Sequence, residues 1–384
     1  MNRRLWLALP AIVALVFAAC GGGAVTPTTA PTDAAASVAP ATTIPSVDPN
    51  ATRIKLGFVT HVIGNPFIQQ IIDGANAAAK DLNVDLQVTG PEGGDADAQL
   101  KAVQTLVAAG VQGVATSVPG ESMASGLNEI IASGVPIVQF NLLVTSVNAP
   151  YVGERSVESG RILGTKVLDK LGGASAKGKV IIGNCFPGFP VLENRSKGVQ
   201  ESLKKAAGIA IVGPFDVKVA ANENYAAWEA LLAANPDAKA LVGLCAPDIA
   251  SLGKLQAANV DKPIVSGGYD LTVENLVELK AGHAYVSLGQ TPFMQGYLPI
   301  KMLADTIRKI TSVDLSKGGF FDAGTELVTA DSVTEPYSLP ALTFAQLEEI
   351  AASPEKTRAY YQPLVDNQIA NWSTGLEPIE NESK

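Results

Sequence analysis

The residues of this chain best suited to chemistry are amides, one guanidinium and one carboxylate that stand close to aromatic rings. Most of them follow short apolar runs of the kind that form buried strands. Planar polar groups pair with adjacent hydroxyls, and aromatic rings stack on apolar C–H faces. The pattern therefore favours a site for a neutral, polyhydroxylated small molecule. The candidate ligand-binding residues are Asn65, Phe67, Asn141, Phe186, Arg195, Asp270 and Gln290.

The sequence lacks the residue patterns that other kinds of site require. The loop at 60–67 contains neither G-x-G-x-x-G nor a Walker lysine, so no dinucleotide or nucleotide-phosphate site is expected. With two histidines and no C-x-x-C, no metal site and no cofactor are expected, and His61 is interpreted as a polar rim residue. Asp270 and Asp248 are isolated carboxylates without a nucleophile and base beside them, so the chain is not expected to be an enzyme.

The elements that must position these side chains form an α/β pattern that occurs twice. Short apolar runs alternate with longer segments of helical period, at similar intervals in each half. This predicts two similar lobes in series, each with a mostly parallel sheet covered on both faces. The first four strands are expected to begin near Ile54, Val84, Gln112 and Pro136, and the next four near Lys179, Ile209, Lys239 and Pro263.

Helix ends are marked by residues with known capping roles. Asn65-Pro66 supplies an N-cap followed by proline at the first helical position. Gly110, Gly134 and Gly172 stand where helices should stop. Thr343 and Gln346 form a capping-box pattern that opens a C-terminal helix, and Ser353-Pro354 is expected to open another. A strand is expected over 283–289 and a long helix over 291–310.

The amino-terminal segment has the features of a secretion signal. Arg3 and Arg4 precede an apolar run, Leu5–Ala19, that ends in small residues. Cys20 stands directly after this run, which resembles the lipobox of bacterial lipoproteins, with Phe17 where leucine is usual. The resemblance implies a signal peptide over 1–19, lipidation of Cys20 and a flexible linker over 20–52. The alternative is an ordinary signal cut after Ala19.

Charge excludes several classes of partner. The chain carries 28 basic and 37 acidic side chains, and removing Arg3 and Arg4 with the signal leaves 26 against 37, or −11. Nucleic-acid binding needs clustered Lys and Arg, so no nucleic-acid partner is expected. No apolar run after the signal is long enough to span a bilayer, so membrane contact is expected through the lipid anchor only.

Five stretches resemble the ribose-type periplasmic sugar-binding proteins that feed ABC transporters. The resemblance covers about 53–310, and less clearly continues to 334. It implies two doubly wound lobes of the periplasmic binding protein type I fold, joined by three hinge crossings, with the ligand between them. The matching stretches are Asn65-Pro66-Phe67, Gly93–Gly110 with Val111-Gln112-Gly113-Val114, Ala132–Val138, Gly267-Gly268-Tyr269-Asp270, and Gly289-Gln290-Thr291-Pro292.

On this resemblance the first lobe comprises 53–152 and 290–312. The second lobe comprises 153–289 and 313–340, followed by a C-terminal helical extension over 341–384. The site departs from the family at Asn141-Leu142, where Asp-Arg is common, at Val219, where an aromatic residue is expected, and at Cys245, where asparagine is expected. A familiar pentose is therefore not assumed, and a deoxy sugar, a cyclitol or an autoinducer-like diol stays open.

Cys185 and Cys245 should end neighbouring strands in the usual 2-1-3-4-5 strand order. Adjacent strands bring Cα atoms close enough for a disulfide, and two buried free thiols are the alternative. The resemblance implies a monomeric, extracytoplasmic protein that captures a small sugar-like solute and delivers it to an ABC permease. The alternatives are a sensory module that presents its ligand to a membrane receptor, and a binding protein for a cyclitol, autoinducer or nucleoside.

Overall fold

The computed structural model describes residues 53–334, 339–340 and 342–384. The predicted signal over 1–19, Cys20 and the linker over 20–52 lie outside the described residues. Within the described ranges, no helix combines the length and the apolar character needed to cross a membrane.

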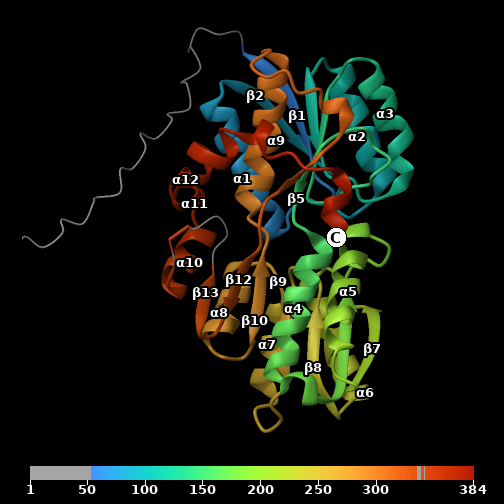
Figure 1. Ribbon diagram of the computed structural model, residues 1–384, viewed down its shortest axis with the longest axis vertical. Coiled ribbons are helices and arrows are strands. Elements are labelled where there is room, and N and C mark those ends of the chain that lie inside the picture. Colours follow the sequence, from blue (N-terminus) through green and yellow to red (C-terminus); the bar gives the residue numbers. More distant parts are fainter. Residues whose placement is uncertain (1–52, 335–338, 341) are drawn as a thin grey trace, which may run out of the picture. The chain divides into compact units, whose positions relative to one another are not determined.

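The first lobe is built on a six-stranded parallel sheet (Figure 1). Its strand order is β11-β5-β4-β3-β1-β2, which contains the 2-1-3-4-5 order of doubly wound folds. Four strands, β1 to β4, begin within one residue of their predicted positions. In β1, β3 and β4 nearly every residue is buried, as expected for apolar runs in a sheet covered on both faces. The strands are β1 Ile54–Val59, β2 Val84–Thr89, β3 Gly113–Thr116, β4 Ile137–Phe140, β5 Tyr151–Gly153 and β11 Phe320–Asp322.

Helices cover this sheet with their apolar faces. The helix α1 begins where predicted, because the Asn65 side chain accepts hydrogen bonds from the backbone N–H groups of Phe67 and Ile68. Gly110 and Gly134 end two other helices with positive φ, as predicted. The helices are α1 Pro66–Asp81, α2 Ala96–Ala108, α3 Ala124–Ala132 and α9 Pro292–Ile307, with short 3-10 turns at Glu121–Met123 and Leu315–Lys317.

The second lobe repeats the design with a seven-stranded sheet of order β13-β12-β10-β9-β8-β6-β7. The strands β6 to β10 are parallel, and β12 and β13 extend one edge of the sheet as antiparallel strands. The strands are β6 Lys177–Asn184, β7 Gly208–Asp216, β8 Ala238–Gly243, β9 Val265–Tyr269, β10 Val286–Gly289, β12 Glu326–Thr329 and β13 Ser332–Thr334. The helices are α4 Ser156–Lys170, α5 Pro190–Leu203, α6 Ala221–Ala234, α7 Asp248–Ala258 and α8 Val273–Lys280, with a 3-10 turn at Gly173–Ser175.

Three crossings join the lobes, between β5 and α4, between β10 and α9, and between β11 and β12. Arg155 at the first crossing forms an ion pair with Asp322 at the third, with an N–O distance of 3.0 Å. The predicted lobe boundary at residue 313 is wrong, because β11 pairs with β5 of the first lobe. Phe320 of β11 is buried and stacks on Tyr151, and Phe321 lies in the core of the first lobe, so this short edge strand belongs to that lobe.

The C-terminal extension packs on both lobes. The capping box of Thr343 and Gln346 opens the first of its helices as predicted, and Leu347 of that helix lies in an apolar cluster of the second lobe. Tyr361 and Trp372 instead lie in the core of the first lobe. The helices are α10 Phe344–Ala351, α11 Pro354–Tyr360 and α12 Gln362–Leu364, followed by a π-helix at Val365–Ile369 and 3-10 turns at Trp372–Thr374 and Ile379–Ser383 (Figure 1).

Close packing of α1 against α9 leads to a first prediction. A Cβ atom added at Gly296 would lie 1.8 Å from the carbonyl oxygen of Ile71, so the two backbones would have to separate. We expect Gly296→Ala to lower the free energy of unfolding by about 3 kcal/mol, as overpacking of a rigid core does. Urea denaturation of residues 53–384 measures the change. Gly93→Ala, where no atom lies within 4 Å of the added Cβ, is the control and should leave stability nearly unchanged.

Candidate functional site

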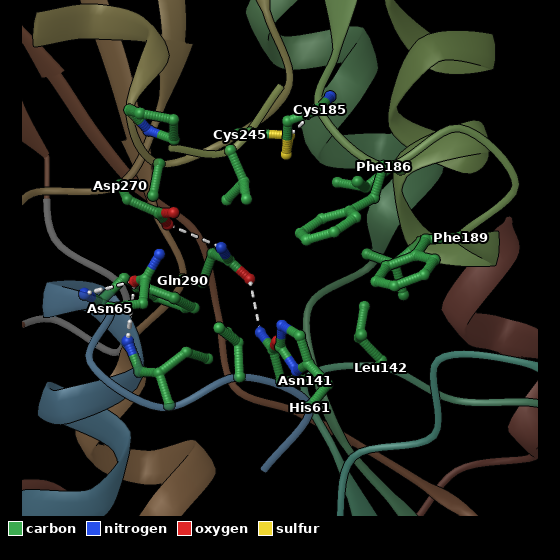
Figure 2. Close-up of a pocket in the computed structure, with 18 of the residues that line it drawn as sticks. His61, Asn65, Asn141, Leu142, Cys185, Phe186, Phe189, Cys245, Asp270 and Gln290 are labelled. Carbon is green, nitrogen blue, oxygen red and sulfur yellow. Dashed lines mark hydrogen bonds between the residues drawn. A yellow bond between two sulfur atoms is a disulfide. The ribbon is translucent and has the colours of Figure 1, made fainter. Parts of the chain in front are cut away.

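All seven predicted ligand-binding residues line one cavity at the carboxyl ends of the strands (Figure 2). The space between the lining residues is about 510 Å³, which includes a part open to solvent. Its walls come from both lobes. The lining residues are His61, Val62, Asn65, Phe67, Ile68, Asn141, Leu142, Cys185, Phe186, Phe189, Val191, Leu192, Arg195, Val219, Cys245, Ala246, Pro247, Asp270 and Gln290.

Strand ends hold the polar residues in special backbone conformations. Asn141 follows β4 with φ of 61°, and Asp270 follows β9 with φ of 71°. Asn and Asp adopt this left-handed region more readily than most residues, so each turns its chain at the strand end. Asn65 combines capping of α1 with a position on the cavity wall, which leaves its amide nitrogen for a ligand.

A chain of side-chain hydrogen bonds connects three polar residues that line the cavity. Gln290 donates from Nε2 to Asp270 Oδ1 at 2.7 Å. Asn141 donates from Nδ2 to Gln290 Oε1 at 3.4 Å and to Gln295 Oε1 at 3.1 Å. Figure 2 shows Asp270, Gln290 and Asn141 in a row along one side of the cavity. We call this row the polar edge, and its fixed orientation suits hydroxyl groups that both donate and accept.

Burial sets the charge state of the carboxylate in the polar edge. It raises the pKa of Asp270 to about 7, although the nearby Arg195 and the hydrogen bond from Gln290 act in the opposite direction. Asp270 therefore changes its charge near neutral pH. A ligand hydroxyl that donates to the carboxylate would favour the ionised form.

Arg195 lines the cavity but is already held by the protein. It is 3% exposed, its Nε donates to Glu154 Oε1 at 2.5 Å, and a terminal nitrogen donates to the carbonyl of Leu244 at 2.9 Å. The guanidinium also lies 3.9 Å from the centre of the Tyr269 ring. Glu154 was not predicted, because it lies 41 residues away and only the fold brings it to Arg195.

Aromatic rings form the opposite wall. Phe186 and Phe189 stack with ring centres 4.7 Å apart, and Phe189 meets His61 edge to face at 6.2 Å. Burial lowers the pKa of His61 to about 4, so the ring is neutral at physiological pH, and its Nδ1 lies 3.2 Å from the hydroxyl of Ser117. Phe67 lines the cavity and also belongs to the core of the first lobe.

Phe189 and Leu142 were missed as site residues. Both stand next to candidates in the sequence, in the Phe186–Phe189 loop and after Asn141, and both line the cavity. No sequence motif distinguishes an apolar residue that lines a binding site from an apolar residue of the core. Their distance from the strand ends was the one available signal.

A disulfide joins Cys185 and Cys245 at the edge of the same cavity, as Figure 2 shows. The strands β6 and β8 that precede the two cysteines are hydrogen-bonded neighbours, with a parallel register that ends at Gly183 and Gly243. The bond therefore fixes two loops of the second lobe to each other beside the site.

The disulfide carries a second prediction. Residues 53–384 should show no mass shift on alkylation without reductant and two modified thiols after reduction and unfolding. Replacing both cysteines with serine should lower the free energy of unfolding by about 3 kcal/mol, because the link closes a long loop. Alkylation of unreduced, unfolded protein would contradict the bond, and urea denaturation of the double variant measures its effect.

Comparison with known proteins identifies related chains and folds. A family profile described as a periplasmic binding protein domain matches residues 56–310. The xylose/arabinose-binding protein XylF of Sulfolobus acidocaldarius is 24% identical over 311 residues, which cover 74% of this chain and 73% of the relative.

Solved structures agree with the fold. GanP, a glucose-galactose binding protein from Geobacillus stearothermophilus, matches with a TM-score of 0.66 and 23% identity, over 73% of this chain and 98% of that chain. An ABC transporter solute binding protein from Burkholderia graminis C4D1M, solved with D-arabinose, matches with a TM-score of 0.67 and 23% identity, over 73% of this chain and 97% of that chain. The two-lobed parallel-sheet fold is therefore shared with these proteins.

Proposed function

Because the chain belongs to the periplasmic binding protein family, we propose that it captures a small sugar or sugar-like polyol between its lobes and delivers it to an ABC permease. The observation that carries this proposal is the polar edge of Asp270, Gln290 and Asn141, which faces stacked aromatic rings inside a cavity lined by both lobes. The named relatives bind xylose or arabinose, and glucose or galactose, which supports a carbohydrate ligand.

The mechanism follows from the position of the site. Residues of both lobes line the cavity, so a ligand that touches both lobes stabilises the closed arrangement over the open one. The three crossings allow the lobes to rotate as rigid bodies. The permease then recognises the closed, loaded form, and no covalent step is involved.

We assign no catalytic role to the carboxylates near the cavity. Asp248 is fully buried and accepts hydrogen bonds from Trp228 Nε1 at 2.8 Å, Asn224 Nδ2 at 2.8 Å and the backbone N–H of Cys245 at 2.8 Å. Its oxygens therefore hold the loop after β8 in place. Asp270 acts as a hydrogen-bond acceptor for the ligand.

A thermal-shift screen of residues 53–384 tests the proposed function. Pentoses, hexoses, deoxy sugars, cyclitols and nucleosides are added singly, and a ligand at 100 times its Kd should stabilise the protein by about 2.7 kcal/mol. A shift with at least one sugar or cyclitol supports the proposal. A shift with nucleosides alone, or with none of these compounds, contradicts the carbohydrate class.

The location is part of the same proposal. A monomeric protein outside the cytoplasmic membrane, anchored through lipidated Cys20, would stay close to its permease. A linker of 32 residues gives a root-mean-square reach of roughly 30 Å. The support is the basic, apolar and small-residue pattern that ends at Cys20. Expression of Cys20→Ala should release the protein from the membrane fraction, and unchanged membrane association would contradict the anchor.

A further inference from the structure

We propose that the cavity selects a deoxy sugar, whose hydroxyls meet the polar edge while a hydrocarbon group meets the opposite wall. This inference rests on the proposed function and names the class of sugar. It follows from an asymmetry within the cavity. Hydrogen-bonding groups gather along the polar edge, whereas Leu142, Phe186, Phe189 and the Cys185–Cys245 disulfide face it (Figure 2). These residues and Val219, which also lines the cavity, are called the apolar wall, and the neutral ring of His61 borders it at Phe189.

Side chains of this apolar wall offer no hydroxyl, amide or charged group to a ligand. The stacked rings of Phe186 and Phe189 form one part of it, and the disulfide forms another, with Cys185 7% and Cys245 5% exposed. Both cysteines are oxidised, so neither carries an S–H donor. The wall therefore presents hydrocarbon and sulfur surface only.

Backbone N–H groups of three residues in the apolar wall are also occupied. The N–H of Cys245 donates to Asp248 Oδ2 at 2.8 Å, and the N–H of Phe186 donates to Asn184 Oδ1 at 2.9 Å. The N–H of Cys185 points to the sulfur of Cys245 at 3.2 Å. Each of these groups already has a partner within the second lobe, so none is left to bind a ligand hydroxyl.

Arg195 adds its polarity on the side of Asp270. Its Nε donates to Glu154 and a terminal nitrogen donates to the Leu244 carbonyl, and its charge acts on the nearby Asp270. The guanidinium also lies over the ring of Tyr269, the residue that precedes Asp270. The ion pair with Glu154 holds Arg195 in this place, because leaving that buried carboxylate unpaired is costly.

The apolar wall reaches the border with a wider cleft. This cleft shares Val62, Asn65, Val219, Ala246 and Pro247 with the cavity, and Asn65 is the only one of these five with a polar side chain. Beyond the shared residues the cleft is also lined by charged groups, among them Glu92, Lys254 and Glu274. A hydrocarbon group therefore meets apolar surface inside the cavity and at this border, but not farther out.

Affinity should therefore depend on whether the sugar carries a hydroxyl at the position that faces the apolar wall. A hydroxyl held against the apolar wall loses its water partners and gains none, whereas hydrogen or methyl at that position loses nothing. Such an unpaired group weakens binding by roughly tenfold or more. The deoxy sugar should therefore bind at least about tenfold more tightly than its hydroxylated parent.

Titration calorimetry on residues 53–384 with four matched pairs tests the inference. The pairs are D-galactose with D-fucose, L-mannose with L-rhamnose, D-glucose with 2-deoxy-D-glucose, and D-ribose with 2-deoxy-D-ribose. We expect the deoxy member to bind about tenfold more tightly in at least one pair. If sugars bind but the parent is equal or tighter in every pair, the inference fails and the proposed function stands. If none of the eight sugars binds, the inference fails as well, and the proposed function is then decided by the wider thermal-shift screen.

A variant locates the preference in the apolar wall. Val219→Asn places an amide on this wall at a half-buried position, so the ratio of parent to deoxy Kd should fall about tenfold. Val260→Asn, at a position 71% exposed and outside the cavity, is the control and should leave the ratio unchanged. An unchanged ratio in a folded Val219→Asn protein would show that the wall does not set the preference.

Discussion

Replacing Asp270 with asparagine is expected to weaken sugar binding about a hundredfold. Asparagine keeps the size of the side chain and the acceptor for Gln290 Nε2, which lies 2.7 Å from Asp270 Oδ1. It removes the charge and one acceptor oxygen inside a buried site, where hydrogen bonds to a charged group contribute most. Calorimetric titration of wild type and variant with the same sugar at pH 8 measures the difference.

The pH dependence separates this explanation from a loss of folding. Since the pKa of Asp270 is about 7, the ionised acceptor is lost as the pH falls from 8 to 6, and wild-type affinity should fall with it. The variant should show a flatter profile. If Asp270→Asn leaves sugar affinity unchanged, or if wild type and variant show the same dependence of affinity on pH, Asp270 does not belong to the binding site. Asp261→Asn, on the exposed surface, serves as the control.

The stability of the unliganded protein should respond to Asp270→Asn in the opposite direction to its sugar affinity. The folded-state pKa of Asp270 is raised to about 7, above the unfolded value near 3.9. Its contribution to stability is therefore fully present below pH about 4 and is lost as the pH rises through 7. Asparagine removes the cost of burying the charge at pH 8, so the unliganded variant should be at least as stable as wild type. Weak binding in a stable variant then reports on the site.

Replacing Trp372 with alanine is expected to lower the free energy of unfolding by about 4 kcal/mol. Trp372 is 2% exposed and belongs to the core of the first lobe, so its removal leaves a large cavity. Its Nε1 donates to Asp305 Oδ2 at 2.9 Å, and Lys301 Nζ donates to the same oxygen at 2.8 Å. Urea denaturation of residues 53–384 measures the loss. An effect below about 1 kcal/mol would mean that the C-terminal extension is peripheral to the fold.

A conservative variant divides the effect into its two parts. Trp372→Phe keeps most of the apolar ring and removes the hydrogen bond to Asp305, so it should cost about 1–2 kcal/mol. If phenylalanine costs as much as alanine, the polar contact with Asp305 dominates. Retention of sugar binding by Trp372→Phe is expected, because Trp372 does not line the cavity.

Sequence periodicity predicted the strands well, most clearly in the central strands β1, β3 and β4, where nearly every residue is buried. The start of β1 at Ile54 and the cap of α1 at Asn65 depend on local chemistry, which a single sequence contains. Cys185 and Cys245 are 60 residues apart, so their proximity came from the expected strand order rather than from local chemistry, and that order left a disulfide and two free thiols as alternatives.

Features that depend on distant contacts were not predictable. The strand β11 has three residues, too few for a period, and it forms because β5 leaves an open edge that Phe320 can cover. Glu154 reaches Arg195 only after the first crossing folds. The attachment of the C-terminal extension to both lobes, through Leu347 on one and Trp372 on the other, also follows from the shape of two assembled cores.

Hydrogen–deuterium exchange of residues 53–384, with and without the sugar that gives the largest thermal shift, tests the central claim most directly. A ligand held between the lobes should protect the loop at 60–66 of the first lobe together with the loops at 185–189 and 245–247 of the second. These three segments belong to opposite walls of one cavity. Protection of both lobes by the same sugar is the predicted result. Protection confined to one lobe, or to surfaces outside the cavity, would contradict capture between the lobes.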